Sequence, residues 1–167
     1  MNGTSIASVE RGISTVLEWL RQAAYLVAPL VLRIALALPF FRSGLTKWDG
    51  FLSLSPTAVF LFEEQFKLHI LGGVYDLPAP DMLAFIDALA EIILPILLIV
   101  GFATRFSALG LLVMTGVIQL VVPDGWANFH LPWATMAVAL IAIGPGALSL
   151  DHLIAAIFRP RKPRGVA

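Results

Sequence analysis

The chain contains no cysteine, few charged residues and no surplus of charge of either sign. Without cysteine it cannot form disulfides, zinc–thiolate sites or iron–sulfur clusters, and it has no cysteine nucleophile. Only 13% of its 167 residues are charged, and the 11 basic residues balance the 11 acidic ones. A nucleic-acid-binding domain has a basic surplus, and a disordered chain combines low hydrophobicity with high net charge. The composition therefore excludes both classes.

Apolar residues are abundant instead and make up 59% of the chain. They gather in four long runs with few or no charges, at about 23–42, 82–102, 106–122 and 131–150. A helix needs about 20 apolar residues to cross a bilayer, whereas barrel strands are shorter and alternate in polarity. We therefore predict an all-α integral membrane protein, with a four-helix transmembrane domain at 23–155 that is embedded in the lipid bilayer.

The segments outside the four runs have patterns of their own. In residues 1–22, apolar residues recur at helical spacing, which predicts an amphipathic helix on the inner membrane surface; the alternative is a simple extension of the first span. Residues 156–167 form a basic tail. In the long loop 43–80, Ser55 followed by proline predicts a helix start, and the glycines at 72–73 predict a tight turn or small hairpin. We expect this outer loop to be partly helical.

The basic residues predict the orientation of the chain in the membrane, because cytoplasmic segments are enriched in lysine and arginine. If there are four spans, seven basic residues lie on the side of the two termini: Arg11, Arg21, Arg105, Arg159, Arg161, Lys162 and Arg164. Three lie on the other side: Arg42, Lys47 and Lys67. We therefore expect a multi-pass protein of the plasma (inner) membrane with both termini in the cytoplasm.

Three ionisable residues fall inside the predicted spans, where a charge costs roughly 3 kcal/mol on insertion scales. They are Arg33 in the first span and Asp87 and Glu91 in the second. Counted from the ends of their spans, Arg33 and Glu91 both lie about 15 Å deep, so we expect them to pair. Lys47 lies on the face of Arg33 and would reach Asp87 if the helix continues past Pro39. These four charged residues form either a ligand or proton site or a structural network that fixes helix register.

The histidines give little support for a tightly bound haem and some for a metal site. A membrane b-type haem needs two histidines at matched depth on facing helices, and no pair here has that placement, so we do not expect haem. His69 and His130 would both lie near the outer surface, where they are candidates for a copper or zinc site. The chain carries no motif for intrinsic catalysis.

Several short motifs occur together in a fixed order along the spans. Arg33 is followed by Phe40-Phe41-Arg42-Ser43-Gly44-Leu45-Thr46-Lys47, and Glu91 by Pro95 and then Gly101-Phe102-Ala103-Thr104-Arg105. The fourth run ends in Gly144-Pro145-Gly146-Ala147-Leu148-Ser149-Leu150-Asp151. This pattern over about residues 28–155 resembles the DoxX family of small four-span membrane proteins.

The resemblance implies a role beside redox or stress-related proteins. The family is named for a protein linked to thiosulfate:quinone oxidoreductase and quinol-oxidase complexes, and other members accompany superoxide-detoxifying and sulfurtransferase proteins. A further group, similar to this chain at Ser43–Lys47 and Leu61–Glu64, accompanies enzymes that make metal-binding modified peptides. Because this chain lacks cysteine, direct sulfur chemistry on it is not expected.

The sequence leaves three functions open. The first is a membrane component of a redox or oxidative- or metal-stress system, such as an accessory subunit of an oxidoreductase complex, with a buried charged cavity that binds a quinone or conducts protons. The second is a component for binding, biosynthesis or export of a metal-binding modified peptide. The third is a scaffold for partner enzymes. Small residues in and just before the third span also allow close packing, either within the bundle or between copies, as in a homo-oligomer.

Overall fold

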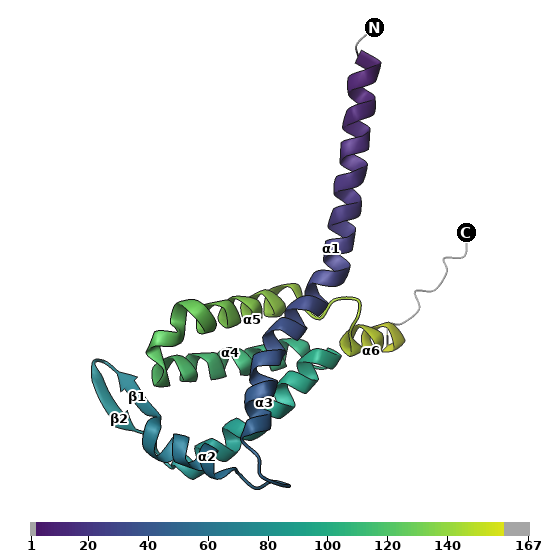
Figure 1. The fold of residues 1–167 in the computed structure, drawn as a ribbon. Coiled ribbons are helices and arrows are strands. Elements are labelled where there is room, and N and C mark those ends of the chain that lie inside the picture. Colours follow the sequence, from purple (N-terminus) through teal and green to yellow (C-terminus); the bar gives the residue numbers. More distant parts are fainter. Residues whose placement is uncertain (1–2, 159–167) are drawn as a thin grey trace.

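A computed structural model of the chain describes residues 3–158, with side chains described from residue 12 onward. The structure is mostly helical (Figure 1). Its long helices are α1 (Gly3–Thr46), α3 (Pro80–Val100), α4 (Thr104–Val121) and α5 (Leu131–Ile143). The shorter elements are α2 (Pro56–Phe60), η1 (Leu61–Gln65), β1 (Lys67–Ile70), β2 (Gly73–Asp76), η2 (Pro123–Gly125), η3 (Trp126–His130) and α6 (Leu150–Phe158).

Four helical segments are long and apolar enough to cross a bilayer: Gly12–Thr46, Pro80–Val100, Thr104–Val121 and Pro123–Ile143. Lipid offers no hydrogen-bond partners, so backbone groups in such segments must be satisfied within the helix. The predicted all-α fold class, a four-helix membrane bundle, is confirmed. The chain is a multi-pass membrane protein.

The fourth span differs from the expected 131–150. It begins earlier, with η2 and η3 continuing into α5, and it ends at Ile143. Gly144 has a φ of +83° and leaves the helical conformation, and the proline that follows it cannot restore the lost hydrogen bonds. The chain then forms the separate helix α6.

The N-terminal segment is not a separate helix. Residues 3–22 continue without a break into the first span as the single helix α1, which matches the alternative of a simple extension of that span. Figure 1 shows this half of α1 standing away from the other helices, and all side chains from residue 12 to residue 28 are exposed. The side chains of residues 1–11 and the basic residues of the expected tail lie outside the described residues.

The bundle packs α1 against α3 and α4 against α5. Its core is made of eight buried apolar residues: Leu36, Ala37, Phe40, Leu98, Ala108, Leu111, Ala137 and Leu140. Gly44 brings α1 and α3 close together, because a Cβ atom there would lie 2.9 Å from the Cβ of Glu91. Small residues permit such close approach of helix backbones in membranes.

The outer loop is partly helical, as predicted. Ser55 caps α2 by accepting a 3.2 Å hydrogen bond from the Ala58 amide, and Pro56 occupies the first turn. The predicted hairpin is also present, since β1 and β2 pair antiparallel with Ile70 opposite Gly73. In this loop, α2 and η1 contact α3, and β1 contacts α4.

Candidate binding cavity and its ion pairs

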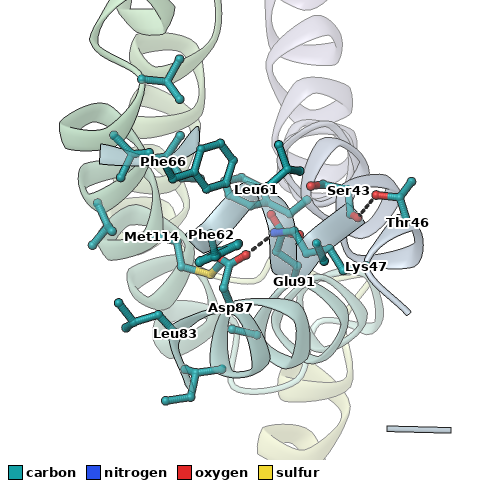
Figure 2. Close-up of a pocket in the computed structure, with 18 of the residues that line it drawn as sticks. Ser43, Thr46, Lys47, Leu61, Phe62, Phe66, Leu83, Asp87, Glu91 and Met114 are labelled. Atoms are coloured by element: carbon teal, nitrogen blue, oxygen red, sulfur yellow. Dashed lines mark hydrogen bonds and ion pairs between the residues drawn. The ribbon is translucent and has the colours of Figure 1, made fainter. Parts of the chain in front are cut away.

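A cavity of about 640 Å³ lies between the outer halves of α1, α3 and α4, with α2 and η1 closing one side and Trp133 of α5 contributing to the wall. Its lining is mostly apolar. Six polar residues interrupt this lining: Ser43, Thr46, Lys47, Thr57, Asp87 and Glu91. Figure 2 shows Lys47 beside the two carboxylates, with Phe62 and Met114 nearby. The cavity thus has a charged region on an otherwise apolar surface.

The charged region is a cluster of three residues, which we call the ion triad: Lys47, Asp87 and Glu91. The Lys47 ammonium forms an ion pair with the Asp87 carboxylate, as predicted from the sequence. It also lies 2.8 Å from Glu91 Oε2. The side chains of Lys47 and Glu91 are 11% and 4% exposed, so this pair is largely removed from solvent. The triad holds two carboxylates against one ammonium.

Local structure places each member of the triad. Asp87 and Glu91 are four residues apart on α3, so they project from the same helix face. Helix α1 continues through Pro39 to Thr46, and Lys47 follows directly. Its carbonyl accepts a 2.8 Å hydrogen bond from the Ser55 amide, which fixes the turn after the helix. The close contact of Gly44 with Glu91 then sets the helix register that lets Lys47 reach both carboxylates.

Phe62 of η1 closes the triad from the outer loop. The Lys47 ammonium lies 5.5 Å from the centroid of the Phe62 ring, a distance at which a cation is attracted to an aromatic face. Phe62 is buried and stacks edge to face on Phe66, with ring centroids 5.2 Å apart. The outer loop is therefore part of the cavity wall.

The cavity wall includes exposed apolar residues of α3 and α4. Ile86, Val113 and Val117 line it, yet 50–60% of each residue is exposed. In a bilayer these surfaces contact acyl chains.

Arg33 lies elsewhere, and the expected Arg33–Glu91 pair is wrong. The Gly44–Glu91 contact fixes the register of antiparallel α1 and α3, so Arg33, about 16 Å further along α1, lies beside Gly101. Arg33 is fully buried and donates hydrogen bonds to the carbonyls of Leu148 and Ile99, the latter at 3.4 Å. A side chain at Gly101 would collide with its guanidinium group.

Asp151 organises this end of the bundle, although the sequence alone did not mark it as a site residue. Its carboxylate accepts hydrogen bonds of 2.8 and 2.9 Å from the amides of Ala103 and Thr104, at the start of α4. Its own amide donates to the Gly101 carbonyl at 2.8 Å, and it attracts the Arg33 charge electrostatically. The Ser-Leu-Asp motif that ends at Asp151 was the signal for this residue in the sequence. Arg33 and Asp151 thus join the turn between α3 and α4 to the segment after α5.

The two histidines lie on the outer end of the bundle and bind different acceptors. His69 Nδ1 is 3.2 Å from the Leu120 carbonyl, and the buried His130 has its Nδ1 2.6 Å from Gln119 Oε1. In the part of the chain that the structure describes, no three His, Asp or Glu side chains gather in a group able to hold a metal. Among the described residues, His69 and His130 therefore do not belong to a three-residue group that could hold a metal.

Comparison with known proteins identifies the family. The DoxX family model matches residues 28–124, which is more than half of the chain and ends before the Gly-Pro-Gly motif. An uncharacterized protein of Haemophilus influenzae is 34% identical over 146 residues, which cover 79% of this chain and 86% of that protein. No solved structure matches the chain. The chain belongs to the DoxX family of membrane proteins.

Proposed function

We propose that the cavity binds a membrane quinone and that the protein is a membrane component of a redox system. The observation that carries the proposal is the cavity itself: its wall is mostly apolar, its charges are confined to the ion triad, and apolar residues of α3 and α4 in its wall are also exposed. A quinone has the matching form, with a polar ring on a long apolar tail. The cavity volume of about 640 Å³ falls in the range of about 300–1,000 Å³ typical of small-molecule sites.

The triad supplies the chemistry that a redox quinone needs beside it. Reduction and oxidation of a quinone take up and release protons, and carboxylates such as Asp87 and Glu91 accept and return protons. The chain has no cysteine to form a disulfide or iron–sulfur centre. We therefore assign the transfer of electrons to a partner protein and the positioning of the quinone to this chain.

The excess of basic residues on the side of the termini supports an orientation with both termini in the cytoplasm of a plasma-membrane protein. In this orientation the cavity lies in the outer half of the bilayer. A quinone bound there would exchange protons with the outer side through the triad.

A binding titration tests the proposal. The purified protein in lipid nanodiscs is titrated with decylubiquinone, and tryptophan fluorescence is recorded. Because Trp133 lines the cavity, we expect saturable quenching that is largely lost in Trp133→Phe. Trp19→Phe is the matched control, since Trp19 is 70% exposed on the part of α1 that stands apart from the bundle, and it should keep the saturable phase. Quenching that rises linearly without saturation in all three proteins would refute quinone binding.

A further inference from the structure

The geometry points to a site that prefers the reduced, hydroxyl-bearing form of its ligand, a quinol, over the oxidised quinone. This inference rests on the proposed function and concerns the redox form that the same cavity selects. It follows from which hydrogen-bonding groups of the lining are already engaged and which are not.

The cation of the cavity is already engaged on several sides. Lys47 Nζ pairs with Asp87 and with Glu91 and lies over the ring of Phe62. A quinone offers only carbonyl oxygens, which accept hydrogen bonds and donate none. To bind a quinone carbonyl, the ammonium would have to give up part of its contact with a buried carboxylate, which is costly in a low-dielectric site.

The smaller polar groups offer few donors as well. The Thr46 hydroxyl donates to the Ser43 carbonyl at 2.8 Å, and the Ser43 side chain hydrogen-bonds to Glu91. Thr57, the remaining hydroxyl of the lining, belongs to an exposed residue of α2. Within the described lining, the groups next to the triad are therefore poor partners for a carbonyl.

Acceptors are available, by contrast. Glu91 Oε2 is completely buried, and the partner that the structure gives it is the Lys47 ammonium, in an ion pair at 2.8 Å. Asp87 also lines the cavity, and the two carboxylates outnumber the single ammonium. The ammonium has three N–H donors, whereas each carboxylate has about four acceptor sites, so acceptor capacity remains for a donor on a ligand.

A quinol carries two hydroxyl groups on its ring, which donate where the quinone only accepts. Hydrogen bonds from a hydroxyl to a carboxylate are stronger than those between neutral groups. One such bond favours the quinol by about tenfold or more over the quinone. The apolar tail contributes equally to both forms, so the preference comes from the head group alone.

The test compares the two redox forms of one compound on the intact protein. Decylubiquinone and its dithionite-reduced quinol are titrated into nanodisc-embedded protein without oxygen, and the dissociation constants are compared. We expect the quinol to bind about tenfold or more tightly. Equal affinity, or tighter quinone binding, would overturn the inference and leave the proposed function standing. Binding of neither form would overturn the proposed function itself.

Two variants assign the preference to the triad. Glu91→Gln places an amide donor where the carboxylate oxygen lies, so the quinol preference should fall to about twofold or less. Glu64→Gln makes the same chemical change on an exposed residue of η1 and should keep the wild-type ratio. A preference that persists in Glu91→Gln would overturn the assignment. If Glu91→Gln does not fold, Asp87→Asn, whose wild-type side chain is 22% exposed, provides the same comparison.

Discussion

At the scale of single residues, the protein holds its membrane charges in two separate groups with different partners. Lys47 is shared between Asp87 and Glu91 at the cavity, while Arg33 binds backbone carbonyls and faces Asp151 at the opposite end of the bundle. The first group borders open space and the second is enclosed. We therefore attribute ligand binding to the triad and a structural role to Arg33.

Stability measurements should separate these two groups. Lys47→Met leaves two carboxylates without their cation and should lower the free energy of unfolding by about 3–5 kcal/mol. Combined with Glu91→Leu, it should show a coupling energy of about 0.5–3 kcal/mol, because the residues are in contact. Reversible unfolding in mixed micelles measures these values.

The matched cycle pairs Arg33→Met with Glu91→Leu. The two residues have no partner in common, so their effects should add to within about 0.5 kcal/mol. A coupling as large as that of the Lys47 pair would mean that Arg33 and Glu91 interact after all, contrary to the register described above.

At the scale of helices, the approach of α1 to α3 decides where the triad forms. Gly44→Ala would place a Cβ atom 2.9–3.0 Å from the side chain and backbone of Glu91, and should cost about 1–3 kcal/mol in unfolding free energy. Gly116→Ala is the matched control, because nothing lies within 4 Å of a Cβ atom there. That variant should be neutral or slightly more stable, since alanine favours helix. Equal effects of the two substitutions would show that the helices are not closely packed at Gly44.

The start of α4 depends on a cap that comes from far along the chain. Asp151→Ala removes both hydrogen bonds to the amides of Ala103 and Thr104 and should cost about 0.5–2 kcal/mol. Asp151→Asn keeps one acceptor oxygen and should recover part of that loss. The thermal unfolding midpoints of the two variants measure the difference. A midpoint for Asp151→Asn at or below that of Asp151→Ala would contradict this role of the carboxylate.

The sequence predicts the helices better than it predicts their register. Run lengths identify the four spans, and the cap at Ser55 and the turn at Gly72 identify the outer helix and hairpin. The expected Arg33–Glu91 pair is wrong because equal depth, counted from the span ends, does not fix the register of two antiparallel helices: Gly44 contacts Glu91, and Arg33 lies beside Gly101. Gly44 and Asp151 both belong to motifs visible in the sequence, but their partners are distant along the chain and the motifs do not identify them.

At the scale of the whole molecule, α1 is much longer than a bilayer requires. Its 44 residues span about 66 Å, roughly twice the thickness of the hydrocarbon core. The bundle, the cavity and the outer loop lie along the C-terminal half of this helix, and its N-terminal half stands away from the other helices (Figure 1). The proposed orientation follows from four crossings, which would place the first and last described residues on the same side of the membrane.

The absence of cysteine makes the orientation easy to test, because any introduced cysteine is the only one in the chain. Leu71→Cys lies at the fully exposed tip of the hairpin, and a membrane-impermeant maleimide should label it in intact cells. Phe158→Cys, at the exposed end of α6, should be labelled only after the membrane is permeabilised. The opposite labelling pattern would reverse the proposed orientation.

The quinone content of the protein, extracted in native lipid discs, tests the central claim most directly. Wild-type protein should carry quinone at a higher ratio to phospholipid than the surrounding membrane does. Ala90→Phe, which fills the cavity, should abolish this enrichment, whereas Val138→Phe, on an exposed face of α5 outside the cavity, should keep it. Quinone at the bulk membrane ratio in all three proteins would contradict the account and leave the triad a purely structural feature.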